Sequence, residues 1–464
     1  MDATLDVGRR IVQMLWDPEP TNDIVKDQPV WCLGTSYRLN NTNTHKHPEN
    51  TSSPTTASAV AAAAAHDSSP STTSNNNNDI TSDNNNNPSP AQGPAKLPET
   101  PPDSISSSLD SSLAYEDAPR DGGWPPAFLD DFESRVWMTY RSEFEPIAKS
   151  HDPKALAALS FSMRIKTQLS DQAGFSSDSG WGCMIRSGQS LLANAMQTEK
   201  LGRGWRRGAE GEQEKHLLSL FADDPRAPYS IHKFVDHGAA ACGKYPGEWF
   251  GPSATARCIQ ALTNANEPDL RVYSTGDGPD VYEDNFMKIA MPDGKTFHPT
   301  VVLVGTRLGI DKITPVYWEA LIASLQMPQS IGIAGGRPSS SHYFVGVQGL
   351  YFFYLDPHFT RPALPYHEHS ADYTPDEIDT CHTRKLRRLH IKEMDPSMLI
   401  GFLIRSEDDW TDWRRGVKHV QGKSIIHVSD HDPVAHCEAN ENSFMDQVEA
   451  MSDDENDADT ALDG

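Results

Sequence analysis

A long polar segment sets the first limit on what this chain can fold into. Residues 40–112 consist largely of Asn, Ser, Thr, Ala and Pro, including asparagine runs at 75–78 and 84–87. Large apolar side chains are nearly missing there, so burial cannot offset the entropy that ordering the segment would cost. We therefore predict a disordered insertion that separates an N-terminal arm, residues 1–39, from a large domain, residues 113–430.

The end of the chain is polar in a different way. Residues 446–464 contain eight Asp or Glu and neither Lys nor Arg, and the whole chain carries a formal net charge of −25. We predict an acidic disordered tail over residues 431–464. An acidic balance of this size disfavours nucleic acid as a partner.

Cysteine usage indicates the compartment. The six cysteines show no CxxC pair and no spacing typical of a structural zinc site, so we expect free thiols and neither a metal ion nor a cofactor. The first 16 residues lack the apolar core of a secretory signal, and no 18-residue apolar stretch occurs. Together these features predict a reduced, cytoplasmic protein. The cysteines are at positions 32, 183, 242, 258, 381 and 437.

Apolar periodicity along the large domain predicts helices mainly in its first half and strands in its second. Helices followed by an antiparallel sheet indicate an α+β fold. We expect a loop over 164–178 and a short extended piece at 30–34. The expected helices are 128–144, 183–199, 217–221, 231–237, 254–262 and 317–325; the expected strands are 269–274, 300–305, 330–334, 342–347, 350–355 and 399–405.

One cysteine lies at the start of a predicted helix, in the run SDSGWGCMIRSGQS at 177–190. Gly180 and Gly182 flank Trp181 and permit a tight turn directly before Cys183. A helix N-terminus offers free backbone N–H groups and a partial positive charge, which favour thiolate over thiol. We therefore expect Cys183 to be a nucleophile; the alternative is a small buried side chain.

A thiol nucleophile needs an imidazole base and a third group that orients the imidazole. Asp356 and His358 follow an aromatic strand, and Pro357 between them favours an extended conformation in which both point the same way. An alternative base is His342, which begins the preceding strand and could also be oriented by Asp356. The spacing alone leaves both histidines open, and a surface proline turn is the simplest alternative to a site.

Acyl transfer by a thiolate also needs hydrogen-bond donors for the developing oxyanion. The backbone N–H of Cys183 is available at the helix start. Papain-like enzymes add a glutamine six residues before the cysteine, but here that position is Ser177. A second donor must therefore come from elsewhere.

A series of different short motifs follows from about residue 130 to 413, and one more lies near the N-terminus. In this order they resemble the autophagin family, the autophagy-related cysteine endopeptidases that process a ubiquitin-like modifier. The motifs are VWCLG at 30–34, WMTYR at 137–141, SGWGCM at 179–184, YSIH at 229–232, GEWFGP at 247–252, RLG at 307–309, MPQS at 327–330, GGRP at 335–338, SHYF at 341–344, YLDPH at 354–358 and EDDW at 407–410.

The resemblance implies a papain-like fold with an additional small subdomain, flanked by disordered segments. It implies that Cys183 is the nucleophile, His358 the general base and acid, and Asp356 the residue that orients His358. It also implies that the hydroxyl of Tyr140 completes the oxyanion hole, in place of the missing glutamine.

The resemblance further assigns three residues to substrate binding. Trp249 would cover the active site, and His342 would lie on a mobile loop around Pro338 that packs against this tryptophan. A narrow covered channel suits a substrate that ends in glycine.

The implied reactions are two. The enzyme would cut the modifier precursor after the glycine that becomes its C-terminus, and would later release the modifier from phosphatidylethanolamine. Membrane contact would come only through the lipidated substrate. Two alternatives are a papain-like protease that acts on ubiquitin and a scaffold that binds the modifier without cutting it.

Overall fold

The computed structural model describes residues 19–23, 28–39, 121–169, 174–209, 211–336 and 340–433 of the 464-residue chain. The predicted insertion, residues 40–112, lies outside the described residues. So do Pro338 and nearly all of the predicted acidic tail, from residue 434 onward.

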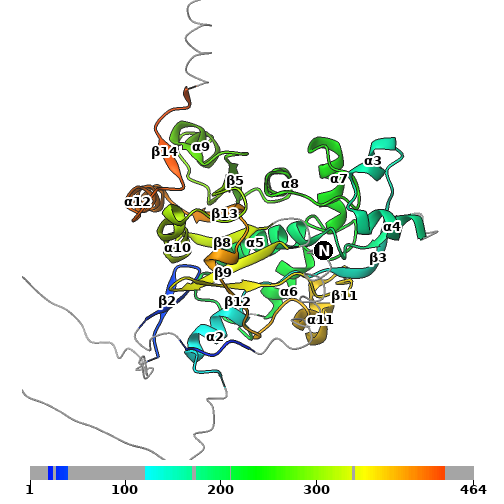
Figure 1. Cartoon of the computed structure of the whole chain (residues 1–464), viewed down its shortest axis with the longest axis horizontal. Coiled ribbons are helices and arrows are strands. Elements are labelled where there is room, and N and C mark those ends of the chain that lie inside the picture. The colour runs from blue at the N-terminus through cyan, green and yellow to red at the C-terminus, as the bar shows by residue number, and fades with distance from the viewer. Residues whose placement is uncertain are drawn as a thin grey trace, which may run out of the picture. The chain divides into compact units, whose positions relative to one another are not determined.

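A nine-stranded sheet forms the centre of the molecule (Figure 1). Its neighbouring strands are antiparallel, except that β5 and β7 run parallel. The strand order is β12 (Arg388–His390), β10 (Tyr351–Leu355), β9 (His342–Gln348), β8 (Ser330–Gly335), β13 (Ser397–Ile404), β7 (Thr300–Arg307) and β5 (Arg271–Ser274), and β1 (Val30–Cys32) pairs with both β9 and β2 (Thr35–Tyr37).

Helices cover both faces of this sheet, and alternation along β7 shows why. Val301 and Leu303 point into one apolar core, while Val302 and Val304 point into the other. The first core is closed by α2 (Pro126–Glu133), α5 (Cys183–Lys200), α6 (Gly211–Ser219), α7 (Ile231–Ala241) and α8 (Pro252–Asn266); the second is closed by α9 (Glu283–Ala290), α10 (Trp318–Gln326) and α12 (Glu407–Lys418). The fold is therefore mixed α+β, as the sequence predicted.

The remaining elements are short. They comprise a three-stranded sheet of β11 (Arg361–Pro362), β3 (Arg141–Ala148) and β4 (Gly174–Ser177), a parallel pair of β6 (Asp280–Tyr282) and β14 (His427–Ser429), the helices α3 (Pro153–Ala158), α4 (Phe161–Leu169) and α11 (Pro375–Asp379), and the 3₁₀ turns η1 (Pro315–Tyr317), η2 (Ser370–Asp372) and η3 (Ile391–Glu393).

Helix α5 is buried along almost its whole length, from Cys183 to Thr198. Gly188 makes this possible, because a Cβ atom there would collide with the side chain of Thr255 on α8. The structure confirms the predicted helix at 183–199. It also confirms the predicted strands around 300–305, 330–334, 342–347, 350–355 and 399–405.

The predicted helix at 128–144 is wrong beyond Glu133. Two side chains of α5 bind the backbone of the following segment in an extended conformation. Asn194 accepts a hydrogen bond from the backbone N–H of Val136 and donates one to its carbonyl, and Ser190 accepts from the N–H of Met138. These groups replace the helical hydrogen bonds, which periodicity alone could not reveal.

The predicted loop at 164–178 is also wrong. Residues 161–169 form α4, and residues 174–177 form β4, which pairs with β3. Among the described residues, none of the helices combines the length and apolar character that a bilayer span requires.

Candidate active site

The turn before α5 has the geometry that its glycines predicted. Gly180 has a φ of +95°, a conformation that favours glycine. At Gly182, a Cβ atom would overlap the carboxylate of Asp178. The carbonyl oxygen of Asp178 accepts hydrogen bonds from the N–H groups of Trp181 (3.1 Å) and Gly182 (2.8 Å). The turn therefore closes on Asp178 and delivers Cys183 to the first position of α5.

Buried charges hold this turn in place. The guanidinium of Arg186 on α5 contacts the carboxylates of Asp178 and Asp223, at 2.7 Å each. The other oxygen of Asp178 accepts a hydrogen bond from the backbone N–H of Arg141 at 2.6 Å. All three charged side chains of the Arg186 cluster are shielded from solvent. The cluster thus ties the nucleophile turn to the start of β3, directly after Tyr140.

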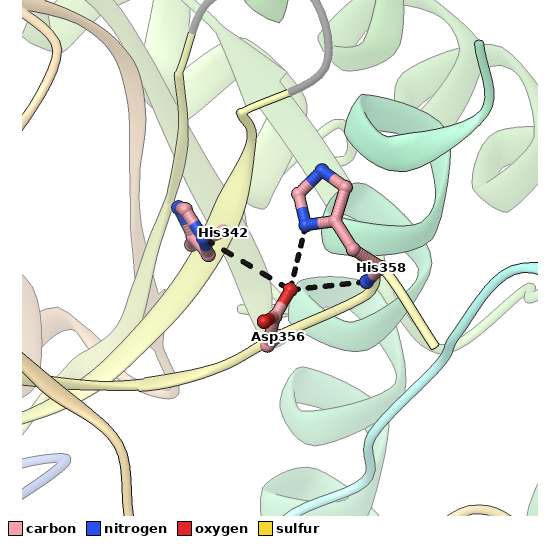
Figure 2. A group of neighbouring side chains, drawn as sticks. All are labelled: His342, Asp356 and His358. Carbon is pink, nitrogen blue, oxygen red and sulfur yellow. Dashed lines mark hydrogen bonds and ion pairs between the residues drawn. The ribbon is translucent and has the colours of Figure 1, made fainter. Parts of the chain in front are cut away.

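Asp356 and His358 follow the end of β10 and form a bonded pair (Figure 2). One oxygen of Asp356 lies 2.6 Å from Nδ1 of His358 and also accepts the backbone N–H of His358 at 3.0 Å. The indole N–H of Trp137 donates to the carbonyl of Asp356 at 2.7 Å, and Arg387 lies 3.8 Å from its second carboxylate oxygen. Both side chains therefore have a fixed orientation. The predicted extended conformation is wrong, because Pro357 and His358 form a turn in which the Asp356 side chain accepts the backbone N–H of His358.

His342, the alternative base, lies on the other side of the same carboxylate. Its Nε2 is 4.0 Å from the Asp356 oxygen that His358 contacts, as Figure 2 shows. The His342 ring packs edge-on against Tyr354, with ring centres 4.5 Å apart. The structure therefore brings both histidines to Asp356, with His358 at hydrogen-bonding distance.

The buried Cys183 thiol interacts with His358 of this pair. Burial alone would raise the pKa of Cys183, but the hydrogen bond and positive charge of His358 lower it below its ordinary value. For His358, burial opposes protonation, yet its bonds to Asp356 and Cys183 raise its pKa to about 9. The carboxyl pKa of Asp356 falls well below its usual range despite burial, because His358 and His342 favour the charged form. These directions favour a thiolate–imidazolium pair.

Tyr140 lies against the same histidine. Its ring meets that of His358 edge-on, with 5.4 Å between centres, and burial beside Cys183 raises its pKa so that it keeps its proton. Backbone hydrogen bonds to Pro357 and from Arg361 hold it there. Its hydroxyl is buried, and its polar neighbours include the Cys183 thiol and the backbone of Gly180. A buried donor in this position is available to a reacting oxygen.

Trp249 lies in the loop between α7 and α8 and packs partly against the first core. Its indole N–H is buried and has no hydrogen-bond partner in the part of the chain that the structure describes. Pro338, the centre of the predicted mobile loop, lies outside the described residues.

Sequence reasoning missed two contributors to the site. The backbone of Ser341 hydrogen-bonds the Cys183 sulfur and helps to lower its pKa. The cluster of Arg186, Asp178 and Asp223 supports the nucleophile turn from behind. Asp178 stands in the motif run, but only the three-dimensional contacts distinguish a buried structural acid from an exposed one.

The ligand atoms of His342, Asp356 and His358 lie within 4.8 Å of one another, close enough to share a metal ion. A metal at this point would need Nδ1 of His358 and the Asp356 oxygen that already bind each other at 2.6 Å. We therefore interpret the group as a hydrogen-bonded catalytic pair with a neighbouring histidine rather than as a ligand set.

A buried thiol bonded to an imidazole, which a carboxylate orients in turn, is the arrangement of thiol hydrolases such as cysteine proteases. Residues 125–416 match the family model described as the Peptidase C54 catalytic domain. The chain belongs to this family, the autophagins, and is a cysteine protease. The family that the sequence motifs indicated is thereby confirmed.

Fungal relatives are similar over nearly their whole length. The chain is 61% identical to "Cysteine protease ATG4" of Pyricularia oryzae, over 98% of this chain and 97% of the relative. It is 62% identical to "Probable cysteine protease ATG4" of Cryphonectria parasitica, over 96% of this chain and 94% of the relative. "Cysteine protease 1" of Neurospora crassa is 58% identical over 97% of this chain and 90% of the relative.

Proposed function

We propose that Cys183 is the nucleophile, His358 the general base and acid, and Asp356 the residue that orients His358. One observation carries this assignment: His358 binds Asp356 through Nδ1 at 2.6 Å and also interacts with the Cys183 thiol, whose pKa it lowers. Nε2 of His342 lies 4.0 Å from the Asp356 carboxylate, whereas Nδ1 of His358 lies 2.6 Å from it, so the geometry favours His358 as the base.

The chemistry follows from these contacts. The Cys183 thiolate attacks a carbonyl carbon, and the carbonyl oxygen becomes an oxyanion that accepts hydrogen bonds from the Cys183 backbone N–H and the Tyr140 hydroxyl. The His358 imidazolium gives its proton to the departing nitrogen, and the C–N bond breaks to leave a thioester. His358, now neutral, takes a proton from water, and the resulting hydroxide releases the acid and the free thiol.

The substrate that fits best is a ubiquitin-like autophagy modifier with a C-terminal glycine. The support is family membership together with relatives named ATG4 at about 60% identity. We propose two reactions of one mechanism: cleavage of the precursor after this glycine, and cleavage of the amide between the glycine and phosphatidylethanolamine. Trp249, His342 and the loop around Pro338 would line the channel for the glycine.

At the level of fold and location, we propose a papain-like catalytic domain over residues 113–430 with a smaller subdomain, acting in the cytoplasm. The long buried helix that begins with Cys183 and the strands that carry His342, Asp356 and His358 support this proposal. They are the two parts between which a papain-like active site forms.

Cleavage of a purified modifier precursor, with an extension after its glycine, tests the function. We expect the wild type and His342→Ala to release the extension, and Cys183→Ala and His358→Ala to lose activity by at least about 10³-fold. Activity in His358→Ala with none in His342→Ala would assign the base to His342 instead.

Two further results would change the substrate or the class. Efficient cutting of a ubiquitin precursor, but not of the autophagy modifier, would favour the ubiquitin protease. Binding of the modifier by a wild type that cuts neither substrate would favour the scaffold.

A further inference from the structure

The two short helices α3 and α4 are joined by residues 159 and 160 alone, and this segment, which we call the α3–α4 hairpin, buries some apolar side chains and exposes others. Leu159 and Met163 are buried in the first core. Phe161, by contrast, is 77% exposed, and Leu156 and Ile165 are each more than 40% exposed. Packing against the protein explains why Leu159 and Met163 are apolar. It does not explain the exposed apolar side chains, because a helix at a protein surface normally presents polar residues to solvent.

The outward face is basic in an acidic protein. Residues 149–169 contain four Lys or Arg and one Asp, a formal charge of +3, whereas the whole chain carries −25. Lys154 and Lys166 are exposed on the same two helices as the apolar side chains. Protruding apolar groups with flanking lysines are typical of helices that lie in the surface of an anionic bilayer.

The hairpin is continuous with the active-site side of the molecule. In the view of Figure 1, α3 and α4 lie on the right, where β3 and α7 are also seen. A Cβ atom at Gly180, in the nucleophile turn, would lie 3.6 Å from the sulfur of Met163 on α4. The hydroxyl of Tyr245, in the loop that carries Trp249, donates to the α3 cap residue Asp152 at 2.6 Å. Movement of the hairpin onto a surface would bring the catalytic turn with it.

We propose that the exposed face of the α3–α4 hairpin, Leu156, Phe161 and Ile165 with Lys154 and Lys166, binds directly to anionic phospholipid membranes. This contact holds the active site at the bilayer surface, where the amide to a lipid headgroup must be cut. This membrane contact is additional to the contact made through the lipidated substrate. The role that we give it rests on the proposed delipidating function.

A bilayer fits this face better than a folded protein does. The exposed apolar side chains are few and protrude, whereas a stable protein interface needs roughly 800 Å² on each partner and a complementary surface. The hairpin is positively charged in a strongly negative protein. An anionic membrane is therefore attracted to this face, whereas the net negative charge of the rest of the protein repels it.

Vesicle flotation of the full chain, without any modifier, tests the contact independently of catalysis. We expect binding to vesicles of equimolar phosphatidylcholine and phosphatidylserine, weaker binding to phosphatidylcholine alone, and release by high salt. Phe161→Ser and the double change Lys154→Glu with Lys166→Glu should each lower the partition by about tenfold or more. Val316→Ser and Lys295→Glu, at exposed positions outside the hairpin, are the matched controls and should bind like the wild type.

A second measurement compares, for the same variants, the rates of cleavage of the lipid-linked modifier and of the soluble precursor. Phe161→Ser should release the lipid-linked modifier from such vesicles at least about fivefold more slowly, while cutting the soluble precursor at the wild-type rate. Equal vesicle binding by the wild type, the hairpin variants and the controls would overturn the proposal. If the wild type does not bind vesicles and Phe161→Ser loses only the cleavage of the soluble precursor, the proposal would also be overturned. The face would then be assigned to binding of the modifier.

The two proposals can fail separately. A wild type that cuts neither substrate but binds vesicles through Phe161 would contradict the function and leave the membrane contact standing. A wild type that cuts both substrates but ignores vesicles would contradict only the contact.

Discussion

The two halves of the active site are held by different forces. Behind Cys183, the turn is fixed by the fully buried charges of Arg186, Asp178 and Asp223. The half that carries His358 and Asp356 is fixed by the end of a strand and by hydrogen bonds near the surface, and both side chains remain partly exposed. Stability therefore depends mainly on the nucleophile half, and proton transfer mainly on the base half.

The strongest expected effect comes from Asp356→Asn, which acts on the base half. The amide has nearly the same volume and its oxygen can still accept the Nδ1–H, but it lacks the negative charge that stabilises the imidazolium, so kcat should fall by about 10³- to 10⁴-fold. The free energy of unfolding, measured with urea, should change much less than kcat suggests. Equal losses of stability and rate would contradict the division between the two halves.

Arg186→Met should break the nucleophile half. It removes the cation and leaves the carboxylates of Asp178 and Asp223 buried without it, so we expect a loss of about 3–5 kcal/mol in the free energy of unfolding. Urea unfolding measures this loss. Arg226→Met is a matched control, because Arg226 pairs with Asp224 at the surface and should contribute less than about 1 kcal/mol. Similar stability of the two variants would show that the buried cluster is not what holds the turn.

The smallest expected effect is a change in the reactivity of the Cys183 thiol when His358, in the other half of the site, is replaced. In the wild type, His358 lowers the pKa of Cys183 against the effect of burial. In His358→Ala the effect of burial is opposed by the hydrogen bonds of Ser341 and Tyr140 but no longer by His358. The pKa of Cys183 therefore rises, and its alkylation by iodoacetamide at pH 7 should slow by about tenfold or more. Raising the pH should restore the rate in the variant.

Mass spectrometry of each alkylated cysteine gives this measurement with an internal control. Cys242 is partly exposed and is not part of the site, so its alkylation should be the same in both proteins. In the wild type, the imidazolium partner of the thiolate is lost as the pH rises through about 9, the pKa of His358. Unchanged reactivity of Cys183 in His358→Ala would mean that the helix start alone activates the thiol.

Sequence patterns predicted elements whose stability is local or repetitive. Helix α5 and strands β7 to β10 and β13 were predicted because their side chains alternate or recur at the period of the element. The extended segment after Glu133 was not predicted, because Asn194 and Ser190 bind its backbone from a helix more than fifty residues away. Tyr140 reaches His358 only because this segment is extended, so its helical prediction and its predicted role were incompatible.

By itself, the sequence determined the helix that begins at Cys183, the α+β class and the family, since these depend on local spacing and ordered motifs. It left two histidines open as the base, because both lie near one aspartate and periodicity cannot measure a distance. The tertiary structure placed His358 at 2.6 Å and His342 at 4.0 Å from the same oxygen. It also decided that Asp178 and Arg186 are buried and that Phe161 is exposed, because burial depends on what segments remote in the chain cover.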